Sequence, residues 1–251
     1  MNGAEKALSQ IDVHRWRGVE IGPLMTPLIR REDGDVRYID RAPTAELRRW
    51  YSSDPKVDLN KIVEVDYVWD EKPLSQCLGG EVFDYCVGSH VVEHIPDVIT
   101  WLQEIAVILR PGGVLSLVVP DKRYTFDILR RTSALEDVVA AFVSRLRKPS
   151  PRQIFDHFSH FTEVDTVALW DGKVDVESLR PEKTGAAALA IAREAHASGK
   201  YIDSHCWVFT PDSFLALLKE IDNLGLLDFD VAAFFPTEKP TLEFHVSLRR
   251  R

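Results

Sequence analysis

The sequence predicts an α/β fold built on a doubly wound, mostly parallel sheet of seven strands, of which the last is antiparallel. Three observations support this fold class. The first half of the 251-residue chain alternates short apolar runs with helical stretches, which is the pattern of parallel strands joined by crossovers. The final apolar runs lie close together and predict a hairpin. A helical but less regular segment between these two parts predicts an inserted helical cap.

Five apolar runs predict the first five strands. Each run is rich in Val, Ile, Tyr, Phe or Leu and is bounded by turn residues, as is usual for strands buried in a sheet. A helix is expected at residues 44–51, between the second strand and the third. In chain order the strands are expected at residues 18–22, 36–40, 62–67, 83–88 and 114–119.

The helix between the fourth and fifth strands has the clearest sequence signals. Pro96 suits a first helical position, and Asp97 favours the positive N-terminal end of the helix dipole. The Arg-Pro-Gly-Gly turn at residues 110–113 is expected to stop this helix. Between these signals one face is apolar, formed by Val98, Trp101, Leu102, Ile105, Ile108 and Leu109.

The second half of the chain is expected to add two cap helices, one core helix and the hairpin. Cap helices are predicted at residues 135–146 and 184–198, and the run 148–151, which holds two prolines, breaks the first of them. Thr210-Pro211 starts the core helix, because it combines an N-cap residue with proline at the first helical position. The hairpin strands are expected at residues 227–235 and 241–248.

Composition and charge narrow the class of ligand. The formal net charge of −8 argues against a general nucleic-acid binder, which needs clustered cations. No apolar run approaches the roughly 18 residues that span a bilayer, and the N-terminus does not resemble a signal peptide. The three cysteines show neither a CxxC spacing nor an even count. We therefore expect a cytoplasmic protein with reduced thiols that binds a small molecule and neither nucleic acid nor membrane, in an oligomeric state that the sequence leaves open.

Polar residues and a glycine stand at the ends of the first three strands. Ligands of open α/β sheets bind beyond the carboxyl ends of the strands, where the strand order reverses. Gly22 lets a ligand approach the backbone, and Asp40, which follows Glu20 by 20 residues, can accept both hydroxyls of a ribose. Asp66, at the end of the third strand, could accept a hydrogen bond from an adenine amino group.

Two further segments carry a family resemblance. Residues 83–97, FDYCVGSHVVEHIPD, and residues 109–115, LRPGGVL, resemble the pattern FDxVxxxxxLEHxPD … LRPGGxL. That pattern belongs to the class I S-adenosylmethionine-dependent methyltransferases, particularly the type 11 group. The resemblance covers roughly residues 18–120. It implies a Rossmann-like class I fold, S-adenosylmethionine as the cofactor and methyltransferase activity (EC 2.1.1.-).

The resemblance also implies how the chain is divided. Residues 1–251 would form a single methyltransferase domain. Its cofactor-binding core would cover residues 15–131, and the inserted cap, which would form the substrate region, residues 132–208. Residues 209–251 would supply the C-terminal helix and the β-hairpin that complete the core.

The same resemblance implies roles for the residues at the strand ends. Glu20 would orient the turn or the methionine amino group, Gly22 would let the cofactor approach, and Asp40 would hold the ribose diol. The other implied contacts are Pro23 in the turn, Asp66 and Tyr67 at the adenine, and Ser89 and His90 on the methionine and reaction side.

One departure from the family pattern keeps a second function open. The family usually carries further glycines after Gly22, where this sequence has Leu24 and Thr26, so the turn must follow a bulkier path fixed by Pro23 and Pro27. The alternative is therefore a non-catalytic protein that keeps the methyltransferase fold as a binding or partner subunit. A nicotinamide-dependent oxidoreductase is disfavoured, because its GxGxxG loop must bring backbone amides onto a pyrophosphate.

Methyl transfer from a sulfonium depends mainly on in-line positioning, and a base is needed only when the acceptor is a hydroxyl or a protonated amine. The candidate bases are His157, His205 and His94, with a structural role as the alternative for His94. Asp203 and His205 have a DxH spacing that would put both side chains on one side of an extended segment. They could form a base–orienter pair or a divalent metal site. Ordinary hydrogen bonding is the alternative that we favour, so no metal is expected.

The acceptor itself is expected to be a small molecule or a glycan precursor, because the chain is acidic and carries an inserted cap. Asp121, Arg123 and Tyr124 follow the fifth strand at the mouth of the expected site, where they could contact the acceptor. Helix capping and surface pairing are the alternative roles for these three residues.

Overall fold

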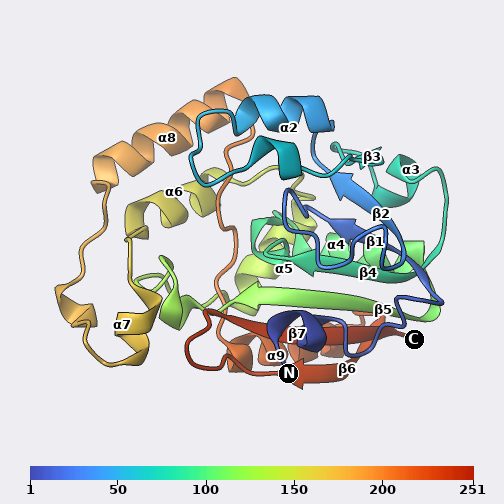
Figure 1. The fold of residues 1–251 in the computed structure, drawn as a ribbon. Coiled ribbons are helices and arrows are strands. Elements are labelled where there is room, and N and C mark those ends of the chain that lie inside the picture. Colours follow the sequence, from blue (N-terminus) through green and yellow to red (C-terminus); the bar gives the residue numbers. More distant parts are fainter.

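The computed structural model describes all residues, 1–251, and shows a seven-stranded sheet with helices on both sides (Figure 1). The strand order is β3-β2-β1-β4-β5-β7-β6. Strands β1 to β5 pair in parallel, while β7 pairs antiparallel with both β5 and β6. The predicted fold class is therefore confirmed. The strands are β1 (Arg17–Ile21), β2 (Asp35–Asp40), β3 (Tyr67–Val68), β4 (Phe83–Ser89), β5 (Leu109–Pro120), β6 (Phe229–Phe235) and β7 (Glu243–Arg250).

Nine α-helices and four short 3-10 turns connect the strands. The helices are α1 (Gly3–Ala7), α2 (Thr44–Trp50), α3 (Leu74–Cys77), α4 (Val98–Ile108), α5 (Leu135–Val143), α6 (Pro151–His160), α7 (Thr166–Trp170), α8 (Gly185–Ser198) and α9 (Pro211–Asn223). The 3-10 turns are η1 (Leu59–Lys61), η2 (Val92–His94), η3 (Lys122–Tyr124) and η4 (Val176–Ser178). None of the helices is both long enough and apolar enough to cross a bilayer.

The main hydrophobic core lies between the sheet and helices α4, α5 and α9. Trp101 of α4, Val138 of α5 and Phe214 of α9 are buried in the same cluster as strand residues such as Val19 and Leu117. Helices α6, α7 and α8 lie together on the side toward which β5 points (Figure 1). This arrangement puts the segment from α6 to α8 beside the carboxyl ends of the parallel strands.

The strand order reverses between β1 and β4. From β1 it proceeds outward to β2 and β3, then returns to the other side of β1 as β4. The connections after β1 and β4 therefore leave the sheet in opposite directions. A crevice opens between two such connections, and this is where ligands of open α/β sheets bind.

Three expected element boundaries are wrong. The fifth strand was expected at residues 114–119, but β5 begins at Leu109 and includes the segment 110–113 that was expected to form a turn. The third strand was expected at residues 62–67, but β3 covers only Tyr67–Val68, because Ile62 is buried against Ala42 and Leu47 of the α2 region instead of joining the sheet. Pro96 does not open α4. Asp97 is the N-cap, and its side chain accepts from the backbone N–H of Thr100.

The start of helix α6 was also not predicted. Residues 148–151 were expected only to break a helix, but Ser150 caps α6 and Pro151 occupies its first turn. Ser150 and Gln153 form a capping box, in which each side chain bonds to the backbone N–H of the other residue. The signal was present in the sequence, since Ser-Pro followed by Gln at the third helical position is a typical helix N-terminus.

Gly18 provides a test of how tightly the sheet packs. A Cβ atom added at Gly18 would lie 2.1 Å from Cε2 of the buried Tyr85, so we expect Gly18→Ala to lower the free energy of unfolding by about 1–3 kcal/mol through overpacking. The matched control is Gly185→Ala in α8, where the added atom meets nothing within 4 Å. This control should leave stability unchanged or raise it by up to about 1 kcal/mol. Urea unfolding measures both variants, and equal stabilities would contradict the prediction.

Candidate functional site

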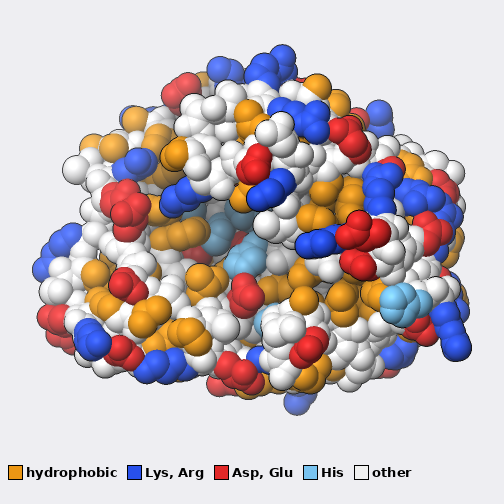
Figure 2. Space-filling view, viewed as in Figure 1, with side chains coloured by type: hydrophobic (Ala, Val, Ile, Leu, Met, Phe, Trp, Pro, Cys, Tyr) orange, Lys and Arg blue, Asp and Glu red, His pale blue; other side chains and the backbone are white.

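A cavity of about 590 Å³ lies at the carboxyl ends of β1, β2 and β4. Gly22 and Asp40 line it from the ends of β1 and β2, and His90 and His94 line it from the connection after β4. Figure 2 shows a hollow on the face of the molecule, with histidine side chains inside it. The cap side of the cavity is lined by Leu146, Arg147, Lys148, Tyr201 and Asp203.

Glu20 stabilises the turn after β1 through hydrogen bonds to its backbone. Its buried carboxylate accepts hydrogen bonds from the backbone N–H groups of Leu28 at 2.8 Å and Ile29 at 3.1 Å. Burial raises the pKa of Glu20 to about 7, and these two backbone hydrogen bonds oppose the shift only in part. Of the two roles that the resemblance implies for Glu20, its contacts correspond to orienting the turn.

In the turn after β1, side chains pack at positions where the family pattern has glycines. Gly22 has a φ of 65° and Leu24 a φ of 47°, so a non-glycine residue holds a left-handed conformation that costs on the order of 1–2 kcal/mol. The Leu24 side chain lines the cavity and packs on the cluster around Leu47. Its carbonyl accepts from the Val63 N–H at 2.9 Å. Pro23 is buried within the turn and does not line the cavity.

Asp40 presents a carboxylate to the cavity. One of its oxygens, Oδ1, accepts from the backbone N–H of Arg41 at 2.7 Å, and no protein group donates to the other. Burial raises the pKa of Asp40 to about 6, while the Arg41 backbone and charge act in the opposite direction. A ligand hydroxyl can therefore reach a carboxylate oxygen that the protein leaves free.

Asp66 and Tyr67 do not line the cavity. The Asp66 carboxylate accepts from the Tyr38 N–H at 2.7 Å and pairs with Arg31 at 2.8 Å, and the Tyr67 hydroxyl donates to Glu81. Because β3 begins later than expected, its carboxyl end brings Trp69 and Asp70 to the cavity instead. The shift in this strand thus explains why Asp66 and Tyr67 do not reach the cavity.

Ser89 and His90 differ in position. Ser89 ends β4 and does not line the cavity, whereas His90 lines it with a φ of 53°. His90 Nε2 lies 2.8 Å from a Glu243 carboxylate oxygen, and Nδ1 lies 3.5 Å from Glu93. Burial opposes a charge on His90, but these two carboxylates outweigh it and raise the pKa of His90 to about 10.

The three residues expected to contact the acceptor lie away from the cavity. Asp121 is fully buried, binds the Arg123 guanidinium through both oxygens and accepts from the Thr237 hydroxyl at 2.7 Å. The Tyr124 ring stacks on Trp170 with centroids 3.9 Å apart. These contacts join the connection after β5 to the hairpin loop and to α7, as in the alternative interpretation of capping and pairing.

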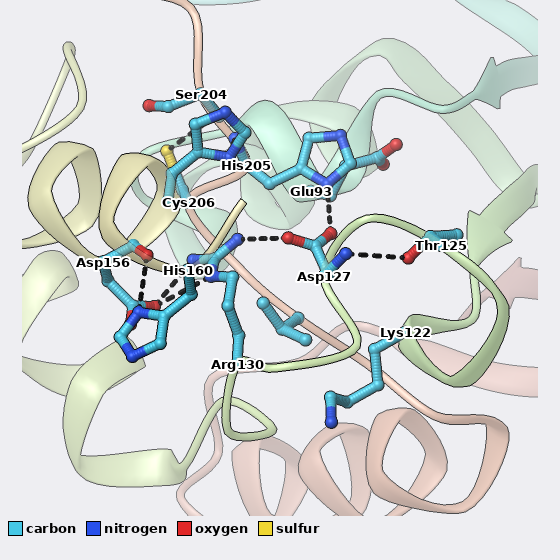
Figure 3. Close-up of polar contacts among 12 residues, drawn as sticks. Glu93, Lys122, Thr125, Asp127, Arg130, Asp156, His160, Ser204, His205 and Cys206 are labelled. Carbon is cyan, nitrogen blue, oxygen red and sulfur yellow. Dashed lines mark hydrogen bonds and ion pairs between the residues drawn. The ribbon is translucent and has the colours of Figure 1, made fainter. Parts of the chain in front are cut away.

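His157 and His205 belong to a buried polar network. Figure 3 shows its members Asp127, Arg130 and His205. His205 Nδ1 lies 2.5 Å from Asp127 Oδ2, and Arg130 bonds Asp127 at 2.8 Å and Asp156 at 2.8 Å. His157 Nδ1 accepts from the backbone N–H of His205 at 3.3 Å. Burial, followed by the Arg130 charge, lowers the pKa of His157 to about 4, so His157 is neutral near pH 7.

His94 is the candidate base that lines the cavity. Its Nδ1 lies 3.0 Å from Asp203 Oδ1, so Asp203 orients His94 and not His205 as the DxH spacing suggested. Although burial opposes a positive charge, Asp203 and Glu93 raise the pKa of His94. The His94 and His205 rings meet edge to face, with centroids 4.7 Å apart. Each of these two histidines therefore has its own carboxylate partner.

Sequence reasoning missed several residues that shape the site. Asp127 and Arg130 gave no signal, because their partners lie far away in the sequence. Arg41 places its guanidinium carbon 3.5 Å from the centre of the Tyr201 ring, which joins the end of β2 to the cap segment above the cavity. The cation of Arg41 directly after Asp40 could have been noted in the sequence, but its aromatic partner Tyr201 could not.

The chain resembles proteins of known family. It matches the family described as a methyltransferase domain over residues 25–222, which is more than half of its length. Among curated proteins, none matches significantly.

Solved structures of low sequence identity are similar to the chain. A Rhodobacter sphaeroides chain described as a Zn-dependent alcohol dehydrogenase has a TM-score of 0.50 and 12% identity, over 100% of this chain and 90% of that one. An S-adenosylmethionine-dependent methyltransferase from Mesorhizobium loti has a TM-score of 0.48 and 16% identity, over 99% of each chain. The CurJ carbon methyltransferase has a TM-score of 0.45 and 12% identity, over 97% of this chain, which spans only 50% of that one. At these identities the likeness concerns the fold alone.

The raised pKa of Glu20 predicts how stability depends on pH. The folded state holds the Glu20 proton more tightly than the unfolded state, where the carboxyl titrates near 4.5. The contribution of Glu20 to the free energy of unfolding is therefore fully present below pH 4.5 and is lost as the pH rises through about 7. The loss is on the order of 3 kcal/mol. Glu20→Gln does not titrate, so urea unfolding across this range should show the wild type losing stability relative to the variant. A stability difference that stays constant with pH would exclude the shift.

Proposed function

Because the chain belongs to the class I S-adenosylmethionine-dependent methyltransferase family, we propose that it binds S-adenosylmethionine in the cavity and methylates a small molecule or a glycan precursor. The observation that carries the proposal is the convergence of Gly22 and Asp40 on one cavity at the point where the strand order reverses. The bound cofactor would supply an electrophilic methyl group on its sulfonium. All other steps depend on residues of the chain.

The residues that line the cavity fit this cofactor. Gly22 is exposed and lines the cavity. A Cβ atom at this position would lie 3.6 Å from Val91 Cγ2 and would occupy space that a ligand could otherwise use. Asp40 offers an unpaired carboxylate oxygen for the two ribose hydroxyls. Trp69 and Asp70, at the end of β3, would take the adenine contacts expected of Asp66 and Tyr67. An aromatic ring and a carboxylate suit a flat base that carries an amino group.

The size and cover of the cavity support a compact acceptor. Its volume of about 590 Å³ falls within the range of small-molecule sites. Two cations at the cap side are already paired, because Arg147 lies 2.7 Å from Glu104 and Lys148 lies 2.7 Å from Glu71. The cap side thus offers little free positive charge for a polyanion such as a nucleic acid.

An acceptor hydroxyl would have to lose its proton, and His94 is the histidine best placed to accept it. It lines the cavity, and Asp203 holds its Nδ1, which leaves Nε2 free. His157 and His205 are buried and do not line the cavity. General-base catalysis of this kind contributes typically about 10²–10⁴-fold. His94 would therefore assist the reaction, while positioning of the acceptor provides the larger part.

The first prediction concerns the ribose contact. Asp40→Asn removes the charge that would accept two hydroxyl hydrogen bonds, so we expect S-adenosylmethionine and S-adenosylhomocysteine to bind at least about tenfold more weakly, equivalent to 1.5–3 kcal/mol. Isothermal titration calorimetry measures the dissociation constants. The matched control is Asp35→Asn, at the other end of the same strand and away from the cavity, which should bind like the wild type.

A folded wild type that binds neither compound would overturn the proposal and favour a non-catalytic binding or partner subunit. The same alternative would be favoured if the protein bound S-adenosylmethionine but methylated no acceptor. Mass spectrometry would detect methylation as a gain of one methyl group in the acceptor. The glycine-poor turn around Leu24 is the feature that supports this second function.

The second prediction concerns pH. Since burial raises the pKa of Asp40 to about 6, its carboxylate is protonated in acid and loses acceptor capacity. We expect the affinity of the wild type for S-adenosylhomocysteine to fall as the pH drops below about 6. Asp40→Asn should lack this fall. A similar pH profile in both proteins would show that another group governs binding.

A further inference from the structure

Glu93 carries a buried carboxylate to which no group donates a hydrogen bond. The residue is 0% exposed, and both of its carboxylate oxygens lack a partner. A buried polar group left unpaired costs about 1–3 kcal/mol, and a charged group costs more. His90 Nδ1 lies 3.5 Å from this carboxylate but forms no hydrogen bond with it, so the two oxygens remain open to a ligand.

Two histidines face Glu93 in an unusual arrangement. His94 Nδ1 is tied to Asp203 at 3.0 Å, and its Nε2 lies 4.0 Å from a Glu93 oxygen. His205 Nδ1 is tied to Asp127 at 2.5 Å, which leaves its Nε2 as the free ring nitrogen. Ligand atoms of Glu93, His94 and His205 lie within 4.8 Å of one another. Glu93, Asp127 and His205 can be followed together in Figure 3.

This arrangement is characteristic of metal-binding histidines. A histidine that binds a metal usually donates its other ring N–H to a carboxylate, which fixes the tautomer and directs the free nitrogen toward the ion. Both His94 and His205 have such a carboxylate. Two imidazole nitrogens and one carboxylate are a common ligand set for zinc and related cations.

We propose that Glu93, His94 and His205 bind a divalent transition-metal cation such as Zn²⁺. The metal would lie between the buried network of Asp127 and the cavity that His94 lines. Three protein ligands leave a fourth position for water or for an oxygen atom of a ligand in the cavity.

The distances require a modest closure of the three side chains. With metal–ligand bonds of about 2.1 Å, tetrahedral ligand atoms lie roughly 3.4 Å apart. The present separations reach up to 4.8 Å, so the most distant ligand atoms must approach one another by roughly 1.4 Å. Rotation of the Glu93 side chain can supply this movement, because no hydrogen bond restrains its carboxylate.

The backbone around the three ligands is already fixed. The Glu93 carbonyl accepts from the N–H groups of Cys206 at 2.6 Å and Trp207 at 3.2 Å. The Trp207 indole N–H donates to the Ile95 carbonyl at 2.6 Å. These bonds attach the segment that carries His205 to the turn that carries Glu93 and His94, as a preorganised metal site requires.

Protonated histidines are the competing explanation for the buried Glu93 carboxylate. His90 Nδ1 lies 3.5 Å from Glu93, and its other nitrogen is tied to Glu243. In that case His90 and His94 would neutralise Glu93 without a metal, and Arg130 would remain engaged with Asp127 and Asp156. Direct measurement of metal binding separates the two explanations.

The metal site extends the proposed function. The role of the metal in the cavity rests on that proposed function. If a hydroxyl oxygen of the acceptor bound the cation, the cation would lower the pKa of that hydroxyl. Its proton would then pass to solvent through the cavity, because His94 Nε2 would bind the cation and would no longer serve as the base. An acceptor with a hydroxyl group is the class that would benefit. The presence of the metal itself can be tested without any acceptor or cofactor.

The test uses the full chain without an affinity tag. After treatment with a chelator, calorimetric titration with Zn²⁺ alone should show one bound equivalent, confirmed by elemental analysis of the reloaded protein. Glu93→Gln and His205→Asn should each weaken binding by more than about a hundredfold, and Asp203→Asn by about 10- to 100-fold through loss of the outer carboxylate. The matched control is His196→Asn, an exposed histidine on α8 outside the cluster, which should bind like the wild type.

The inference is overturned if the wild type binds no equivalent of Zn²⁺, or if the Glu93 and His205 variants bind it as the wild type does. Circular dichroism checks folding. If Glu93→Gln fails to fold, Asp203→Asn decides the outcome, since Asp203 is largely exposed. S-adenosylhomocysteine binding to the chelator-treated wild type keeps the two proposals apart: retained binding without Zn²⁺ binding refutes the metal site and leaves the proposed function intact.

Discussion

The attachment of the segment around Trp207 to the turn after β4 is the contact on which the site depends. This segment returns from the cap to the sheet, and its backbone N–H groups and indole bond the carbonyls of Glu93 and Ile95. Trp207 is only 1% exposed, so these bonds are formed in an apolar surrounding where an unpaired group is costly. Through this attachment His205 reaches His94 although the two are far apart in the sequence.

A second constraint is the buried charge of Arg130. Its side chain is 1% exposed, and it is neutralised by Asp127 on one side and Asp156 on the other. Removing one member of such a group leaves an uncompensated buried charge, which destabilises more than the pair stabilises. The loop after β5, helix α6 and the returning segment with His205 are therefore held in one mutual position, which suits a site that must keep several side chains in register.

The fold class and a few residues that line the cavity could be predicted from the sequence because their signals are local. Gly22 and Asp40 each follow an apolar run, and the geometry of parallel sheets brings such ends together. The third strand was misplaced because Ile62 is as apolar as a strand residue but packs on α2. The partnerships of His94 with Asp203 and of His205 with Asp127 depend on how the cap folds back over the sheet. No periodicity or spacing within either segment carries that information.

The position of β7 between β5 and β6 has a consequence for how the chain assembles during synthesis. β6 pairs only with β7, so it has no partner in the sheet until β7 has left the ribosome. Until then the edge of β5 also remains open, although β1 to β5 and α4 can already pack together. An unpaired edge of this kind is a known point of aggregation. The nascent chain is therefore most prone to aggregate between the emergence of β5 and that of β7. A chaperone would be most useful during this interval.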